Sequence, residues 1–174
     1  MGGGRMTDIL NLIPDPKFRH AERWSANDAT ISVDTRYQRL NVKNTNGSIS
    51  SFAELILSDV SEYRGVNMTF ACTLSWISGN AAQYGDVLLL ARENNSIWHT
   101  RGDGDAKIHR EALQFTLPDD TTSLALRLYA PATKDIIFQW WLPILTRTED
   151  YQRLLNGTAT GAAVDYFDGD TRPE

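Results

Sequence analysis

The sequence predicts an all-β protein in which two antiparallel β-sheets pack face to face as a sandwich. Residues 124–129 (LALRLY) alternate between large apolar side chains and a second, more polar set, the period of a strand with one buried face. Residues 136–145 (IIFQWWLPIL) are apolar on both faces, so this strand needs a cover on each side. A single sheet cannot cover both faces of one of its own strands. A second sheet packed against the first is the simplest arrangement that helps to bury such a strand.

Other segments show similar short, strand-like patterns between turn sequences. Residues 68–77 alternate large apolar side chains with Thr69, Ala71, Thr73 and Ser75, which predicts a face that is either exposed to solvent or the floor of a groove. The remaining expected strands are residues 9–13, 29–34, 38–43, 52–57, 84–91, 96–100 and 112–117. Many short strands without a long helix are typical of a β-sandwich.

The chain is expected to form one domain with an extension at each end. Residues 1–7 are glycine-rich and form a flexible leader, residues 8–147 form the sandwich, and residues 148–174 form a C-terminal arm. At the start of this arm, residues 148–157 combine early acidic residues, a late arginine and a final glycine. These signals leave two alternatives open, a short helix and an extended arm.

Composition excludes several classes of function. The 17 Lys and Arg residues against 22 Asp and Glu give a net charge of -5, so the overall positive charge of a general nucleic-acid binder is missing, although a local basic patch is not excluded. No segment approaches the ~18 consecutive apolar residues of a membrane span. The single cysteine, Cys72, lies among apolar neighbours and is expected to be a buried, unreactive thiol, which fits folding in a reducing cytoplasm.

Several segments together resemble a known family. They are residues 11–18 (NLIPDPKF), the isolated Trp24, residues 68–76 (MTFACTLSW), residues 115–118 (FTLP) ahead of residues 125–129 (ALRLY), and residues 140–145 (WWLPIL). This combination resembles the jelly-roll carbohydrate-binding modules that are appended to glycoside hydrolases and built into bacteriophage tail and other virion proteins. Residues 166–171 (YFDGDT) are similar to a motif that follows such modules in minor tail proteins of phages infecting actinobacteria.

The resemblance implies a galactose-binding-like jelly roll without catalytic activity. The implied function is a bacteriophage virion module, a minor tail or receptor-binding protein that contacts host-surface carbohydrate or neighbouring virion subunits. Such a protein is made in the host cytoplasm, resides in the tail or on the capsid surface, and forms a trimer or higher homo-oligomer without nucleic-acid or membrane partners. Two alternatives stay open: a purely structural capsid-decoration or tail-assembly domain, and a carbohydrate-binding accessory module of a glycosidase or a small glycosidase itself.

Glycan binding by a sandwich needs flat aromatic faces for the sugar rings and planar polar groups for the hydroxyls. Arg127 and Tyr129 supply one of each from the more polar side of their strand. Further candidates are Tyr84, Trp98, His99 and Trp141. The competing interpretation is that the five tryptophans fill the core and its rim.

No cofactor, metal site or catalytic centre is predicted. Modules of the resembling family commonly hold a structural calcium near the opening turn with an acidic residue in the last strand, whereas residues 138–142 (FQWWL) contain no acid. Two aspartate pairs hold calcium only if loop carbonyls join them: Asp103 with Asp105, and Asp168 with Asp170. The three histidines are not spaced as metal ligands, and no nucleophile-elbow or phosphate-binding glycine motif occurs.

Overall fold

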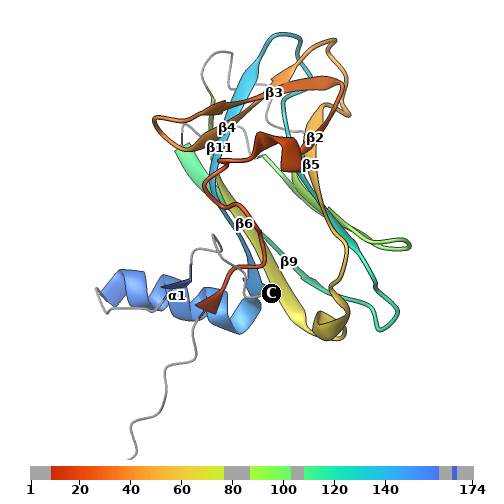
Figure 1. Ribbon diagram of the computed structural model, residues 1–174, viewed down its shortest axis with the longest axis vertical. Coiled ribbons are helices and arrows are strands. Elements are labelled where there is room, and N and C mark those ends of the chain that lie inside the picture. The colour runs from red at the N-terminus through yellow and green to blue at the C-terminus, as the bar shows by residue number, and fades with distance from the viewer. Residues whose placement is uncertain (1–8, 77–86, 103–107, 161–165, 168–174) are drawn as a thin grey trace, which may run out of the picture.

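The structure consists of two five-stranded antiparallel β-sheets packed as layers, which confirms the predicted sandwich (Figure 1). The computed structural model describes residues 9–76, 87–102, 108–160 and 166–167. Sheet I has the order β2-β5-β10-β7-β8, formed by β2 (Ser25–Asn27), β5 (Phe52–Leu57), β10 (Leu124–Tyr129), β7 (Val87–Arg92) and β8 (Ile97–Arg101). Sheet II has the order β3-β4-β11-β6-β9, formed by β3 (Ala29–Asp34), β4 (Arg39–Asn44), β11 (Ile137–Arg147), β6 (Asn67–Trp76) and β9 (Ile108–Thr116).

Smaller elements accompany the two sheets. The short strands β1 (Ile9–Leu10) and β12 (Tyr166–Phe167) pair in parallel. Two 3₁₀ turns, η1 (Ala21–Arg23) and η2 (Ser61–Tyr63), and one α-helix, α1 (Thr148–Thr160), complete the described elements. Within the described residues, no helix is long and apolar enough to cross a membrane.

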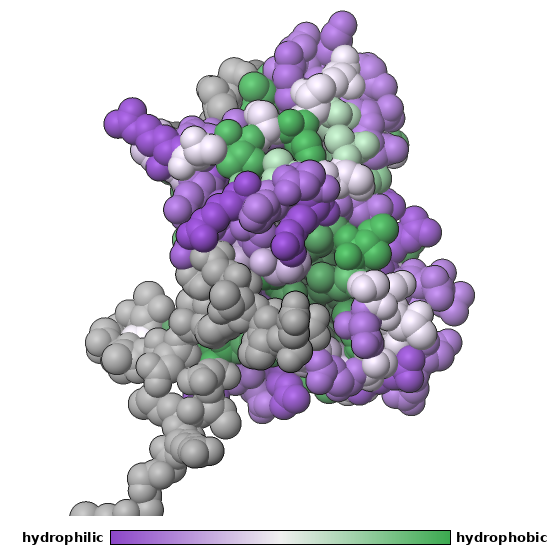
Figure 2. Space-filling view, in the orientation of Figure 1, coloured by the Kyte–Doolittle hydropathy of each residue, from purple (hydrophilic) through white to green (hydrophobic). Residues whose placement is uncertain are grey.

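The core lies between the two sheets and follows the alternation of the sequence. Leu124, Leu126 and Leu128 of β10 are fully buried and belong to the same cluster as Phe138 and Trp140 of β11. From the side seen in Figure 2, hydrophobic residues reach the surface in separate patches with hydrophilic residues around them. Burial between the sheets is therefore the main source of stability, since apolar area removed from water contributes about 25 cal/mol per Å².

Trp24 and Cys72 are both buried, and for Cys72 this confirms the expectation from the sequence. Trp24 is 3% exposed, its ring centroid lies 5.7 Å from that of Phe18, and both side chains belong to the core cluster. Cys72 of β6 is fully buried, and burial raises the pKa of its thiol to about 12, against a smaller lowering by the charge of Arg110. The thiol is therefore protonated and unreactive at neutral pH.

The strand β11 is covered on both faces, as its apolar pattern requires, but by different elements. Its inner side chains face sheet I across the core. On its outer face, Ile144 packs with Ala71 of β6 beneath Tyr151 and Leu154 of α1. Residues 148–160 therefore form a helix rather than an extended arm, and Figure 1 shows α1 lying across one end of sheet II.

A bulge in β11 separates the part of its outer face beneath α1 from the open part. The pairing of β11 with β6 shifts register between Trp141 and Ile144. Leu142, inside the bulge, has a φ of +50°, a left-handed conformation that is strained for a leucine. The inserted residues leave Trp141 on the open side of the bulge and Ile144 under the helix.

Some element bounds differ from those predicted, for identifiable reasons. The first strand ends at Leu10, where its pairing with β12 ends, and the chain then bonds β11 through the side chain of Asn11 and the backbone amide of Leu12. Strand β9 begins at Ile108, since its charged residues still pair with β6 along the edge of the sheet. Strand β2 was not predicted, because its three residues are polar or small and all exposed. Of the predicted strand 84–91, residues 84–86 lie outside the described residues.

Candidate functional site

The six residues predicted for glycan contact do not share one surface. Trp98 of β8 points inward, and its ring stacks on that of Phe115 with centroids 4.9 Å apart and 24° between the planes. Trp141 lies on the outer face of sheet II. Tyr84 lies outside the described residues. The other three, Arg127, Tyr129 and His99, lie on the outer face of sheet I.

On sheet I, Arg127 is held by residues of its own surface. Its Nε donates to Glu54 Oε2 at 2.5 Å, and both side chains are 17% exposed. Its guanidinium carbon lies 4.1 Å from the centroid of the Phe52 ring, which in turn packs on Tyr129 at 5.1 Å. Burial opposes the charge, but the hydrogen bonds and charges of Glu54 and Tyr129 outweigh it and raise the pKa of Arg127 above its ordinary value. Arg127 and Tyr129 are therefore largely committed to internal contacts.

The rest of the outer face of sheet I carries both hydrophobic and polar side chains. Phe52, Leu90 and Tyr129 form a small hydrophobic cluster of their own, separate from the core. Toward the two edges, Ile56 and Ile97 are each 61% exposed. His99 is exposed and stands across the sheet from Leu90 of β7. At the centre of the outer face of sheet I, the polar groups of Arg127 and Glu54 are thus occupied by each other rather than open to a sugar.

The outer face of sheet II presents two polar rows that run across its strands. The register places in one row Asp34, Arg39, Trp141, Thr73 and Arg110. The register places in the next row Ser32, Asn41, Gln139, Ser75 and Ile108. Each row takes one residue from each of the five strands, and the two rows lie on the same side because they are two residues apart along every strand.

The centre of these rows is an aromatic ring surrounded by planar polar groups. Trp141 is half-buried, and the guanidinium carbon of Arg39 lies 4.3 Å from the centroid of its ring. The same guanidinium donates to Gln139 Oε1 at 3.0 Å, and Gln139 Nε2 donates to Asn41 Oδ1 at 2.9 Å. Tyr37, 55% exposed, stands beside Arg39, with its ring centroid 5.4 Å from the guanidinium carbon. We call Tyr37, Arg39, Asn41, Gln139, Trp141, Thr73, Ser75 and Arg110 the polar face.

The helix α1 limits the polar face at one end. Arg110 donates from Nη1 to Thr73 Oγ1 and to the carbonyl oxygen of Leu142, both at 2.9 Å, and from Nε to Tyr151 Oη at 3.2 Å. The small side chains predicted along β6 therefore have two environments, because Ala71 lies under the helix while Thr73 stands beside Trp141. The C-terminal helix thus covers part of sheet II.

Sequence reasoning identified Trp141 on this face but missed its polar neighbours. Arg39 and Asn41 occur in a segment whose alternation predicted a strand, so their shared direction was readable from the sequence. Their position beside Gln139 was not readable, because it depends on the pairing of β4 with β11, almost a hundred residues later.

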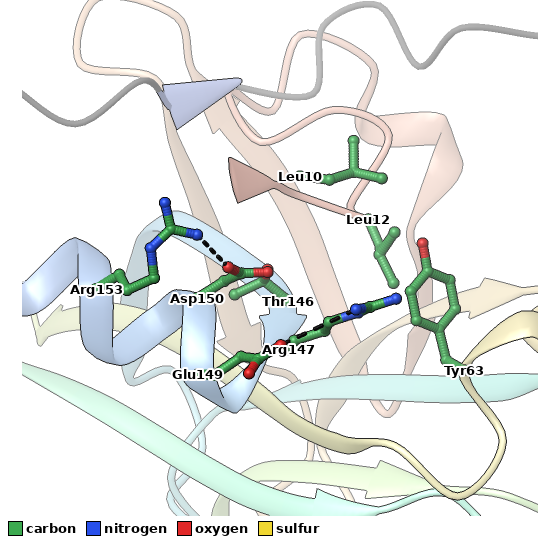
Figure 3. A pocket seen from close by; sticks show the side chains of 8 residues that line it. All are labelled: Leu10, Leu12, Tyr63, Thr146, Arg147, Glu149, Asp150 and Arg153. Carbon is green, nitrogen blue, oxygen red and sulfur yellow. Dashed lines mark hydrogen bonds and ion pairs between the residues drawn. The ribbon is translucent and has the colours of Figure 1, made fainter. Parts of the chain in front are cut away.

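A separate pocket of about 610 Å³ lies where α1 meets the end of β11 (Figure 3). It is lined by Leu10, Leu12, Tyr63, Thr146, Arg147, Glu149, Asp150 and Arg153. Its charged side chains contact one another, since Arg153 bonds Asp150 at 2.8 Å and Arg147 lies 4.0 Å from Glu149. This pocket offers no exposed aromatic plane of the kind that the polar face has, so it is the weaker candidate for binding sugar.

The described residues contain no group of three or more His, Cys, Asp or Glu side chains that could hold a metal ion. The aspartates that the sequence singled out for calcium, at positions 103, 105, 168 and 170, lie outside the described part of the chain. The chemistry on the polar face is therefore stacking and hydrogen bonding by neutral amides, hydroxyls and guanidinium groups.

Solved structures of carbohydrate-binding modules have the same fold. A xylan-binding domain of carbohydrate-binding module family 22 matches with a TM-score of 0.56 and 16% sequence identity, over 79% of this chain and 94% of that chain. The C-terminal family 22 module of Clostridium thermocellum Xyn10B matches with a TM-score of 0.56 and 17% identity, over 79% of this chain and 94% of that chain. These similarities confirm the predicted jelly-roll sandwich.

A bacteriophage protein contains a similar fold within a longer chain. The enzymatically active domain of tailspike protein 4 from bacteriophage CBA120 matches with a TM-score of 0.57 and 9% identity, over 79% of this chain and 21% of that chain. No protein-family model matches the sequence, and no curated protein matches it. The likeness to known proteins is thus one of fold.

Proposed function

We propose that this chain is a non-catalytic carbohydrate-binding module whose glycan lies across the polar face of sheet II. The observation that carries the proposal is Trp141, a half-buried aromatic ring with the Arg39 guanidinium over part of it and the Gln139 amide hydrogen-bonded to that guanidinium. A pyranose ring presents an apolar face that stacks on an aromatic plane, while its hydroxyls meet donors and acceptors at the edge of that plane.

The hydrogen bonds that link Arg39, Gln139 and Asn41 preorganise the polar face for a ligand. Arg39, Gln139 and Asn41 hold one another in fixed rotamers through bonds of 3.0 and 2.9 Å. Binding then costs less side-chain entropy than it would on a surface of mobile side chains. The proposal is supported by the fold that the chain shares with a domain described as xylan-binding.

Affinity electrophoresis through gels that contain a single polysaccharide, run over a panel that includes xylan, tests the proposal. We expect at least one polysaccharide to retard the wild-type protein, and Trp141→Ala to weaken that binding by on the order of tenfold or more, because stacking on an aromatic plane is lost. His99→Ala, on sheet I, serves as the matched control and should bind as the wild type does. Binding that survives Trp141→Ala and is lost in His99→Ala would place the ligand on sheet I instead.

The same proposal states that the chain does not hydrolyse the polysaccharide that it binds. The wild-type protein should release no reducing sugar from any polysaccharide that it binds. Release of reducing ends, abolished by changing one carboxylate, would make the chain a small glycosidase rather than a binding module.

A second candidate function places this module in a bacteriophage virion, as a minor tail or receptor-binding protein. It is supported by the likeness to the tailspike domain and by the resemblance of residues 166–171 to a motif of phage tail proteins. The glycan would then be on the host surface, or the sandwich would pack between virion subunits. Purified virions should contain the chain, and the isolated protein should elute from a sizing column as a trimer or larger. A monomer absent from virions would favour the accessory module of a glycosidase.

A further inference from the structure

The polar face carries two guanidinium groups, those of Arg39 and Arg110, that form no ion pair with a carboxylate among the described residues. Arg39 and Arg110 lie in the same cross-strand row, on either side of Trp141 and Thr73. Within the described part of the chain, Arg39 bonds the amide oxygen of Gln139, and Arg110 bonds two hydroxyls and a carbonyl oxygen. Because a guanidinium group has five N–H donors, each arginine keeps donors available for a ligand.

Two carboxylates on this side of sheet II form contacts with groups other than Arg39 and Arg110. Asp34, at the β3 end of the row, accepts hydrogen bonds from the backbone amides of Arg36 and Tyr37 at 3.1 and 3.2 Å. Asp135 pairs with Lys43 at 2.8 Å, and this contact holds the pKa of Asp135 below its ordinary value. The turn after Asp34 also carries the cation Arg36. Its guanidinium carbon lies 5.1 Å from the centroid of the Tyr37 ring.

The arginines at the centre of the two outer faces have different partners. On sheet I, Arg127 is paired with Glu54 and shielded by Phe52, while Arg92 of β7 is exposed. On sheet II, Arg39 and Arg110 lie on either side of the half-buried Trp141 without a carboxylate partner among the described residues. A protein with a net charge of -5 thus has a local excess of positive charge on the surface proposed to bind glycan.

From this arrangement we infer that the glycan bound by the polar face is anionic and carries carboxylate or phosphate groups. The inference rests on the proposed function and specifies its ligand. Guanidinium groups bind both kinds of oxyanion through paired, charge-assisted hydrogen bonds. Arg39 and Arg110 lie on strands three positions apart in the sheet, about 14 Å at the ordinary spacing of strands. A short acidic oligosaccharide laid along the row therefore reaches both arginines and crosses the exposed part of Trp141 between them.

Matched polysaccharides that differ only in charge test this inference. The carboxylate arm compares polygalacturonate with its methyl ester, and the phosphate arm compares a phosphomannan with the same polymer after phosphatase treatment. We expect the wild-type protein to bind the charged member of at least one pair on the order of tenfold more tightly than the neutral member. Raising the salt concentration to about 0.5 M should remove most of this difference, because exposed charges are then screened.

Two variants remove the same charge from opposite sheets. Arg39→Gln should lose most of the preference for the charged polymer, while Arg92→Gln, exposed on sheet I, should keep it. Equal binding of the neutral and charged members, or of xylan in preference to both, would overturn the inference and leave the proposed function standing. If no polysaccharide of either kind is bound, the proposed function fails and the inference fails with it. Equal losses in both variants would show attraction by overall charge only, and would also overturn it.

Discussion

At the scale of single residues, the buried thiol of Cys72 links stability to pH. Burial raises its pKa to about 12 from the ordinary 9.0, so the folded chain keeps a proton that the unfolded chain releases. Since the unfolded state then binds fewer protons, the free energy of unfolding should fall by about 1.4 kcal/mol per pH unit above pH ~9. Urea unfolding at a series of alkaline pH values measures this slope. The Cys72→Ala variant lacks the ionisable group and should show a shallower fall; identical slopes would contradict the assignment.

The pairing of Arg127 with Glu54 predicts a cost for removing either partner alone. Both side chains are 17% exposed, and Phe52 shields the guanidinium from one side. Glu54→Gln should lower the free energy of unfolding by about 2 kcal/mol, because a largely buried cation loses its counter-charge. Glu149→Gln is the control, since Glu149 is exposed and lies 4.0 Å from Arg147, and it should change stability by less than about 0.5 kcal/mol. Chemical denaturation compares the two, and similar small losses would mean that water already screens the sheet I pair.

At the scale of elements, Tyr151 attaches α1 to sheet II by two separable interactions. Its ring covers Ala71 and Ile144, and its hydroxyl accepts a hydrogen bond from Arg110 Nε at 3.2 Å. Tyr151→Ala should lower the free energy of unfolding by about 3 kcal/mol and increase hydrogen exchange along α1, because the packing is lost. Tyr151→Phe keeps the ring and should cost about 1 kcal/mol or less. Equal losses in the two variants would show that the hydrogen bond, and not the packing, holds the helix.

Elements were predictable where their pattern is local. The alternation in residues 124–129 and the doubly apolar pattern of residues 136–145 are both realised, because side-chain direction in a strand depends only on parity. The same parity rule separates two candidates that stand next to each other, since Trp98 faces the core and His99 therefore faces outward. The identity of the second cover on β11 was not predictable, because a helix and an extended arm both satisfy the local signals of residues 148–157.

The candidate site was less predictable than the strands, because it depends on contacts between distant segments. Arg127 was chosen correctly as outward-facing, but its partner Glu54 lies 73 residues away, and this pairing commits the arginine to the protein. Arg39 and Gln139 are 100 residues apart and become neighbours only through the pairing of β4 with β11. The chemistry of a sheet surface follows from strand register, which one sequence does not specify.

At the scale of the whole molecule, the outer faces of the two sheets differ in how their side chains are partnered. The face of sheet I closes on itself through a hydrophobic cluster and an internal ion pair. The face of sheet II is covered by α1 at one end and, beyond the bulge, has an aromatic ring and two guanidinium groups without a carboxylate partner among the described residues. The surface proposed to bind glycan lies on sheet strands, which hold side chains more rigidly than loops do and suit an extended, repeating ligand.

The buried side chain of Asn11 bonds the N-terminal segment to β11, and this predicts a large loss of stability for a single substitution. Asn11, 2% exposed, donates to the carbonyl oxygen of Pro143 at 2.9 Å and accepts from the backbone amides of Ile13 and Leu145 at 3.1 and 3.0 Å. Asn11→Ala leaves these buried groups without their partner, so the free energy of unfolding should fall by about 3 kcal/mol in a single cooperative transition.

The exposed Asn27 provides the matched control for Asn11. Its Nδ2 also donates to a backbone carbonyl, that of Ser50 at 2.7 Å, but water can replace this bond, so Asn27→Ala should cost about 0.5 kcal/mol. Urea unfolding followed by tryptophan fluorescence and by circular dichroism measures both variants. Equal losses, or a separate early transition of the N-terminal segment in Asn11→Ala, would show that the segment docks onto a sandwich already stable without it. A large loss with coincident transitions would mean instead that the first segment and the last long strand fold as one unit.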